Sequence, residues 1–282
     1  MKNMIVRRYQ IHLKNLPQAF WGYKLLFLTD LHGCVTPLLP ERIAAERPDA
    51  ILIGGDMMVG FLEKEKFGKT RLPEAEAFIA GLAGKYRVFY AYGNHEGKTL
   101  PEAIAAYRSR LEARGVCFLE DASAALVRDG QKLMLHGLCL EQVWYPKGRR
   151  VQYPLSEMVR KLSCYPKERP DGLCHILLAH HPNYFSTYEA WGADLVLSGH
   201  FHGGVMRLPG IGGVIGPDYL PFPPYSGGLY QGKQGAKMIV SCGLGVHTPR
   251  VRIFNPPELT CVELAVERRR EAYGNSGKAG SV

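Results

Sequence analysis

The chain has 282 residues, of which 46% are hydrophobic and 22% are charged, a balance typical of a folded protein with a large core. No stretch approaches the roughly 18 consecutive apolar residues that cross a bilayer, so the sequence predicts no integral membrane span. The net charge of +9 favours anionic partners such as phosphorylated molecules, acidic lipid headgroups or nucleic acid.

Six short apolar runs predict strands, and each is followed by a polar or glycine-rich turn. In chain order they are KLLFLT (24–29), AILIGG (50–55), YRVFYAYG (86–93), KLML (132–135), HILLA (175–179) and ADLVLSG (193–199). Runs of this length that are apolar on both faces are typical of strands buried within a mostly parallel sheet.

Helix signals lie between these runs. The segments are 37–49, 71–84, 100–115 and the shorter 183–192. Segments 71–84 and 100–115 each have a proline near the start and a glycine at the end, the residues that favour the first and last turns of a helix. The alternation of strands and helices predicts a layered α/β fold with right-handed crossovers.

The last quarter of the chain has a different character. Glycine and proline are frequent from residue 203 to 264, and the runs AKMIVSCG and LTCVELAV predict antiparallel strands that complete a second sheet. Residues 267–282 are basic and lack apolar periodicity, so we expect a disordered tail. Because no polar linker divides the rest, residues 1–266 are expected to form one domain.

Two further sequence patterns indicate the cellular compartment of the protein. The seven cysteines are irregularly spaced and form no C-x-x-C pair, which argues against a disulfide framework and against a thiolate zinc site. The N-terminus lacks the apolar segment and cleavage site of a secretory signal. We therefore expect a cytoplasmic protein.

Residues that bind divalent metals follow the predicted strands. They are Asp30, His32, Asp56, Asn94, His95, His180, His200 and His202. The carboxyl ends of parallel strands share one edge of a sheet, so these carboxylate, imidazole and amide groups are expected to converge.

The spacing of these residues predicts two neighbouring metal ions. Asp30, His32 and His202 could hold one ion, and Asn94, His180 and His200 could hold a second. Asp56 is then left to bridge the pair, an arrangement typical of phosphoryl chemistry.

The same motifs, in their order, resemble the calcineurin-like metallophosphoesterase superfamily. They are D-x-H (30–32), G-D (55–56), G-N-H-E (93–96), H-x-P (180–182) and G-H-x-H (199–202). The resemblance implies a four-layer α/β/β/α sandwich with two mixed β-sheets. It also implies two divalent ions, with manganese, iron or zinc favoured, and hydrolysis of phosphodiester or pyrophosphate bonds by a hydroxide that bridges them.

The resemblance also implies roles for individual residues. Asp56 would bridge the metals, and Asn94 would ligate the second ion through its carbonyl oxygen. His95 would not be a ligand but a catalytic general acid or a stabiliser of the phosphoryl oxygens. Separately from the resemblance, the adjacency of Glu96 to His95 in the sequence suggests that Glu96 orients it. The ligand of the H-x-P motif would be His180 rather than the adjacent His181.

The C-terminal motifs suggest a narrower branch. The stretches RLPG, PYSGGLY, IVSCGLG, TPR and PPE resemble bacterial enzymes related to the UDP-2,3-diacylglucosamine pyrophosphatases. This branch implies a nucleotide-linked or lipid-linked anionic substrate and allows peripheral contact with a membrane. The chain departs from it at Cys242, where relatives often carry arginine, and at Glu96, where aspartate is frequent.

Other readings stay open at this point. A metal-dependent nuclease is an alternative, although no separate nucleic-acid-binding domain is evident, and a scaffold that kept the fold without the chemistry is another. His247, Arg250 and Arg149 are candidate substrate contacts. The basic and aromatic stretch 143–154 is a solvated loop or, if functional, a lid over the substrate.

Overall fold

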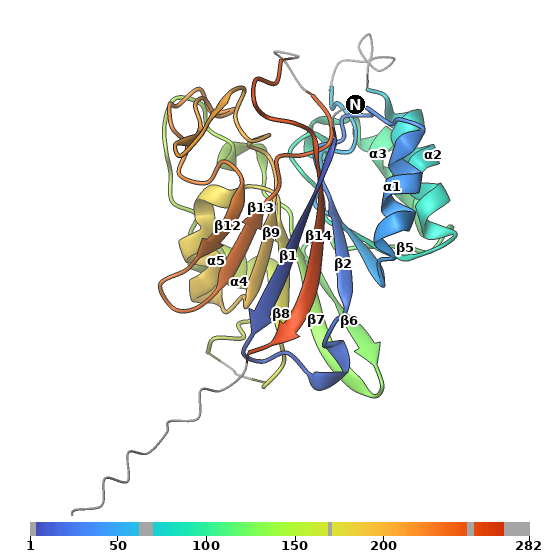
Figure 1. Cartoon of the computed structure of the whole chain (residues 1–282), viewed down its shortest axis with the longest axis vertical. Coiled ribbons are helices and arrows are strands. Elements are labelled where there is room, and N and C mark those ends of the chain that lie inside the picture. Colours follow the sequence, from blue (N-terminus) through green and yellow to red (C-terminus); the bar gives the residue numbers. More distant parts are fainter. Residues whose placement is uncertain (1–3, 62–69, 169–170, 247–250, 268–282) are drawn as a thin grey trace, which may run out of the picture.

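The computed structural model describes residues 4–61, 70–168, 171–246 and 251–267. Two six-stranded sheets lie at its centre (Figure 1). The first has the order β1 (Ile5–Leu13), β14 (Glu258–Val266), β2 (Lys24–Leu28), β3 (Ala50–Ile53), β4 (Arg87–Tyr90) and β5 (Val116–Phe118). The second has the order β12 (Gly228–Gln231), β13 (Lys237–Val240), β9 (Leu195–Ser198), β8 (His175–Ala179), β7 (Gln131–Leu138) and β6 (Ala122–Arg128).

Both sheets are mixed. Strands β2 to β5 run parallel to one another, whereas β14 pairs antiparallel with β2 and parallel with β1. In the second sheet β7, β8, β9 and β13 are parallel, and the edge strands β6 and β12 are antiparallel to their neighbours. The prediction of an α/β fold with two mixed sheets is confirmed.

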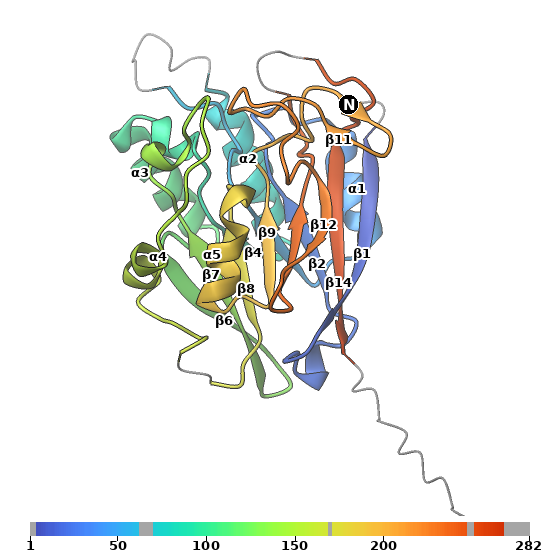
Figure 2. The same ribbon diagram turned by 90° about the vertical axis from the view of Figure 1, so that its left-hand side faces the viewer.

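Helices cover the outer face of each sheet (Figures 1 and 2). They are α1 (Leu38–Glu46), α2 (Leu72–Ala83), α3 (Pro101–Glu112), α4 (Leu155–Leu162) and α5 (Phe185–Trp191). Helices α1 to α3 pack on the first sheet, and α4 and α5 pack on the second. Four of the five correspond to predicted segments, and α4 was not predicted.

Side-chain alternation along the strands builds the layers. On β2, Leu25 and Phe27 enter the core between the two sheets, while Leu26 faces the core beneath α1 to α3. On β8, Ile176 faces the inter-sheet core and Leu177 faces the core beneath α4 and α5. Strands buried on both faces therefore separate three hydrophobic cores, which defines the α/β/β/α layering.

The C-terminal strands differ from the prediction in two respects. We expected the runs near residues 236–243 and 259–266 to complete a second sheet in antiparallel fashion, but β14 lies inside the first sheet, between β1 and β2. Strand β13 does join the second sheet, yet it pairs in parallel with β9. Strand β1, which was not predicted, supplies the parallel partner that makes β14 an interior strand.

The carboxyl ends of the central strands point to one end of the molecule. In Figure 1 the loops that follow β2, β8 and β9 gather at the top. A short hairpin, β10 (Arg207–Leu208) and β11 (Gly212–Gly213), lies in this loop region. No helix among the described ranges is long and apolar enough to cross a membrane.

Candidate metal centre

The predicted metal-binding residues lie in the loops at this end of both sheets. They are Asp30 and His32 after β2, Asp56 after β3, Asn94 and His95 after β4, His180 after β8, and His200 and His202 after β9. All are buried except His202, which is partly exposed. Residues that are far apart in the sequence therefore meet where the two sheets face each other.

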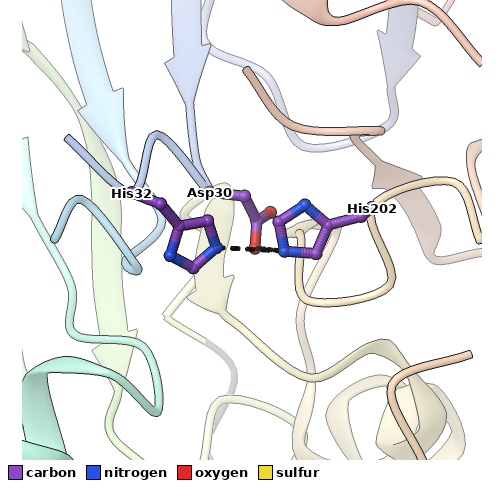
Figure 3. A group of neighbouring side chains, drawn as sticks. All are labelled: Asp30, His32 and His202. Carbon is purple, nitrogen blue, oxygen red and sulfur yellow. Dashed lines mark hydrogen bonds and ion pairs between the residues drawn. The ribbon is translucent and has the colours of Figure 1, made fainter. Parts of the chain in front are cut away.

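One cluster contains Asp30, His32 and His202 (Figure 3). The Nε2 atom of His202 lies 3.1 Å from Nε2 of His32 and 3.2 Å from Oδ1 of Asp30. The Nδ1 atom of His32 lies 3.3 Å from the carbonyl oxygen of Met58, to which it can donate. In that tautomer its Nε2 lone pair faces the other two groups, as a metal ligand requires.

A second cluster contains Asp56, His180 and His200. His180 Nδ1 donates to the Gly54 carbonyl oxygen at 2.7 Å, which fixes the tautomer and leaves a lone pair on Nε2. This Nε2 atom is 3.2 Å from Asp56 Oδ2, yet it is buried and has no aligned hydrogen-bond partner. A buried polar atom without an aligned hydrogen bond needs an explanation, and a cation beside the Asp56 carboxylate would supply one.

The Asn94 amide also faces this cluster. With its oxygen turned inward, the amide oxygen lies 2.9 Å from His200 Nδ1 and 3.2 Å from Asp56 Oδ2, and its nitrogen lies 3.2 Å from Lys98 Nζ. Turning the amide over would instead let its nitrogen donate to both acceptors. The inward oxygen is the arrangement that suits a cation between the three groups.

Asp56 connects the two clusters. It also forms a group with His32 and His95, so its carboxylate lies between the residues of the first cluster and those of the second. The backbone N–H of His95 donates to Asp56 Oδ1 at 2.8 Å and holds the carboxylate in place. The donor atoms of each group lie within 4.8 Å of one another, a spacing that fits a pair of divalent ions.

Burial and charge shift the pKa values of these groups in opposite directions. Burial raises the pKa of Asp30 to about 7. Burial acts the same way on Asp56, but the neighbouring His180 and His95 outweigh it and hold the Asp56 pKa well below its usual range. Against the effect of burial, the carboxylates of Asp56 and Asp30 raise the pKa of His180 to about 10. Two buried carboxylates therefore attract positive charge to this point.

The backbone of the site is strained. Five of the residues have left-handed φ angles, namely Asp30 (55°), His32 (47°), Asp56 (55°), His200 (67°) and His202 (49°). Non-glycine residues adopt this region at a cost of order 1–3 kcal/mol each, and such strain is concentrated at functional sites.

Two glycines allow the backbone to approach the carboxylates. A Cβ atom at Gly93 would lie 2.3 Å from Asp56 Oδ1, and one at Gly199 would lie 2.4 Å from Asp30 Oδ2. These glycines of the G-N-H-E and G-H-x-H motifs are therefore needed for their small size.

His95 lies beside the clusters with a defined tautomer. Its Nδ1 accepts a hydrogen bond from the Gly60 N–H at 2.9 Å, so the proton of the neutral ring is on Nε2. That atom lies 3.9 Å from Asp56 Oδ2, and the ring lines the adjacent cavity.

His181, which follows His180 in the chain, belongs to none of the metal-type groups among the described residues. Its ring packs instead against Tyr145, Tyr184 and His200.

Glu96 has a different position from the one we assumed. Its carboxylate is buried and accepts hydrogen bonds from the backbone N–H groups of Asp56, Met57 and Gly93 at 2.9–3.0 Å and from the Tyr90 hydroxyl at 2.6 Å. These contacts clamp the Asp56 turn to the Gly93 turn. Adjacency to His95 in the sequence was therefore a poor guide to the role of Glu96.

A cavity of about 450 Å³ opens beside the clusters. Asp56, Asn94, His95, His200 and His202 form its floor, and Lys98, Lys147 and Arg252 bring positive charge to its wall. Burial lowers the pKa of the Lys98 ammonium. Lys98 and Arg252 lie outside the sequence motifs, whereas Lys147 belongs to the 143–154 stretch for which a lid over the substrate is the functional alternative.

The structure describes one of the three predicted substrate contacts, Arg149. His247 and Arg250 lie outside the described residues. Arg149 is exposed, and Lys147, two residues earlier in the chain, lines the cavity. In the 143–154 stretch, Trp144 and Tyr145 pack against the core beneath α4 and α5, whereas the basic residues Lys147, Arg149 and Arg150 are exposed.

Comparison with known proteins agrees with this geometry. An uncharacterized metallophosphoesterase of Bacillus subtilis, YkuE, is 26% identical over 256 residues, covering 88% of this chain and 81% of that protein. Phosphodiesterase YaeI of Escherichia coli is 27% identical over 203 residues, covering 69% of this chain and 66% of the relative. An uncharacterized metallophosphoesterase of Helicobacter pylori is 28% identical, and the match covers 86% of this chain and 59% of that protein. Residues 23–204 match the calcineurin-like phosphoesterase family, and the chain therefore belongs to this family.

Proposed function

We propose that this metallophosphoesterase hydrolyses phosphate diesters or pyrophosphates at a pair of divalent ions. The observation that carries the proposal is the buried group of Asp56, His180 and His200, in which His180 Nε2 lies 3.2 Å from the Asp56 carboxylate without an aligned hydrogen bond. Imidazole and carboxylate donors that converge in a buried group are the ligands that such metals use in proteins. A cation at this point would be held by all three residues.

The residues divide naturally between two ions. Asp30, His32 and His202 would hold one, and Asn94, His180 and His200 would hold the other. Asp56 would contribute to both, since it lies between the two groups. The mixed set of imidazole, carboxylate and amide donors suits manganese, iron or zinc.

Ions bound here would supply polarisation of the phosphoryl oxygens and a lowered pKa for the attacking water. The protein groups around them have separate tasks. His95 carries its proton on Nε2, at the cavity surface, and can donate it to the oxygen of the leaving group. Lys98 and Lys147 on the cavity wall would attract the substrate phosphate and offset the charge that grows on it.

The cavity supports an ester with an extended leaving group. Besides the cations, its lining includes the apolar side chains of Val205, Ile215, Val246 and Val251. A nucleotide-linked or lipid-linked phosphate presents both charge and apolar surface, so it would contact both the cationic and the apolar residues of the lining. The name of the Escherichia coli relative supports a diester rather than a monoester substrate.

The test is hydrolysis by protein stripped with a chelator and reconstituted with manganese, iron(II) or zinc. A generic aryl phosphodiester, an aryl phosphomonoester, a UDP-linked lipid, a cyclic nucleotide and single-stranded DNA would be compared. We expect metal-dependent cleavage of diesters or pyrophosphates. Activity that survives complete removal of metal would disprove the proposal.

A matched pair of variants makes the test specific. Asp56→Asn removes the shared carboxylate charge and should reduce turnover at least roughly 100-fold, together with bound metal. Asp129→Asn is the control, because Asp129 is exposed, lies in the turn between β6 and β7, and has a left-handed φ that asparagine tolerates. Equal losses in both variants would contradict the assignment of Asp56.

A further inference from the structure

Large apolar side chains are exposed around the mouth of the cavity. We define the rim patch as Ile211, Ile215, Tyr219, Phe222, Val251, Ile253 and Phe254. Their exposed fractions range from 38% for Ile253 to 78% for Phe254. They make up seven of the twelve large hydrophobic residues that are exposed in the described part of the chain, so such residues are concentrated here and not scattered.

Short backbone pairings join the segments that carry the rim patch. The Val205–Arg207 segment pairs with Ile253 on one side, through the bridge between Met206 and Ile253. On its other side it bonds to Val214 and Ile215, and that segment in turn bonds to Pro221 and Phe222. The segments that carry the rim patch are therefore neighbours, and Ile215, Tyr219 and Val251 also line the cavity.

The aromatic members of the patch are held in an unfavourable backbone conformation. Tyr219, Phe222 and Phe254 have φ angles of 63°, 49° and 51°. Bulky side chains rarely adopt the left-handed region, where glycine or asparagine would be less strained. Three exposed aromatic rings at such positions carry a steric cost without any gain from burial in the core. This cost is explained if the rings contact something outside the chain.

Positive charge borders the same surface. Lys147 Nζ lies 4.9 Å from the centre of the Tyr219 ring and 3.4 Å from its hydroxyl. The Gly148 N–H donates to the Asp218 carbonyl at 2.8 Å, which ties the Lys147–Arg150 segment to the turn that carries Tyr219. Arg149 and Arg150 are exposed next to it.

We propose that the rim patch and the Lys147–Arg150 segment dock on an anionic lipid surface, with the cavity facing the bilayer. Aromatic and aliphatic side chains would enter the boundary between headgroups and acyl chains, while the basic segment would meet the lipid phosphates. A surface for a second protein chain would not require the adjoining cluster of cations, and the net charge of +9 would oppose self-association.

Sedimentation with vesicles tests this proposal without reference to catalysis. Wild-type protein would be mixed with phosphatidylcholine vesicles that contain either no or about 30% phosphatidylglycerol, at low and high salt. We expect binding to the anionic vesicles that weakens as salt rises. The Phe222→Ser/Phe254→Ser variant should lose at least tenfold in vesicle affinity, because both rings would leave the apolar boundary.

Matched variants identify the source of any change. Trp21→Ser removes an equally exposed aromatic residue, beside β14 and away from the cavity, and should bind vesicles like the wild type. Arg149→Ser/Arg150→Ser should bind more weakly and with a smaller dependence on salt. Phe222 and Phe254 do not line the cavity, so their double variant should keep wild-type melting and hydrolysis of a water-soluble ester.

Two outcomes would overturn the proposal. One is equal affinity of the wild type and the Phe222→Ser/Phe254→Ser variant for anionic vesicles. The other is a concentration-dependent dimer, seen by analytical ultracentrifugation, that the same double substitution abolishes. Because binding is measured apart from turnover, a failure here would leave the proposed hydrolase function standing, and an inactive enzyme could still bind vesicles.

Discussion

Substituting Gly199 by alanine is a direct test of how the fold builds the metal centre. Gly199 precedes His200 at the end of β9 and lies against the loop that carries Asp30. A Cβ atom at this position would lie 2.4 Å from Asp30 Oδ2 and 2.4 Å from Thr29 Oγ1. The φ angle of Gly199 is outside the left-handed region, so the effect of the substitution is steric.

The size of the effect follows from these distances. Nonbonded heavy atoms in contact are about 3.5 Å apart, so both neighbours would have to move by about 1 Å. Asp30 and Thr29 are fully buried and are joined by a 3.0 Å hydrogen bond, which leaves them little room. Overpacking of this kind costs roughly 1–3 kcal/mol. Displacing Asp30 should weaken metal binding by roughly 10- to 100-fold, as loss of a supporting contact to a ligand commonly does.

The assay is metal content after dialysis against a graded chelator series, read by elemental analysis, together with thermal melting. Gly81→Ala is the matched control, since Gly81 lies within α2 and an added Cβ meets nothing within 4 Å. That substitution should leave metal binding unchanged and raise stability by about 0.5–1 kcal/mol. Wild-type metal affinity and turnover in Gly199→Ala would refute our account of the Asp30 loop.

Two further predictions concern histidines with different tasks. His95→Ala should reduce turnover by roughly 10²–10⁴-fold while bound metal is retained, and loss of metal in parallel with activity would instead make His95 a ligand. His136 is buried, which lowers its pKa to about 3, and His175 adds to this effect. The contribution of neutral His136 to the free energy of unfolding is therefore complete above pH 6.5 and falls as the pH drops toward 3. By pH 4.5 about 2–3 kcal/mol of the free energy of unfolding has been lost. Urea unfolding of the chelator-treated His136→Gln variant should show a correspondingly flatter pH dependence, and parallel curves for variant and wild type would contradict this.

The central strands and the convergence of the motifs could be predicted because the signals are local. HILLA at 175–179 forms β8 with the expected bounds, and every one of its residues is buried. A polar residue directly after such a run lies at the carboxyl edge of the sheet whatever the details of packing. This reasoning places Asp30, Asp56 and His180 at one end of the molecule without any knowledge of their contacts.

Other features depend on contacts that the local sequence does not encode. The sequence of strand β1 alternates only weakly between apolar and polar residues. Its place beside β14 is decided by long-range pairing from Ile5↔Glu258 to Leu13↔Val266. Within the site, the position of Glu96 also depends on residues far from it in the sequence. Its neighbour in the chain is His95, but two of its hydrogen bonds come from a turn about 40 residues earlier in the sequence, at Asp56 and Met57.

The C-terminal segment shows that the site extends beyond the family match at residues 23–204. The guanidinium of Arg252 is partly buried and donates to the carbonyl oxygens of Cys242 at 2.8 Å and Gly243 at 3.2 Å. Asn255 Nδ2 donates to the carbonyl oxygen of His202 at 2.6 Å. A Cβ atom at Gly243 would in turn lie 2.6 Å from Cβ of Asp30. Two predicted ligands of the same ion, Asp30 and His202, are thus positioned by residues that contribute no ligand atom. Variation in this segment could therefore change metal affinity or substrate choice while every motif residue stayed in place.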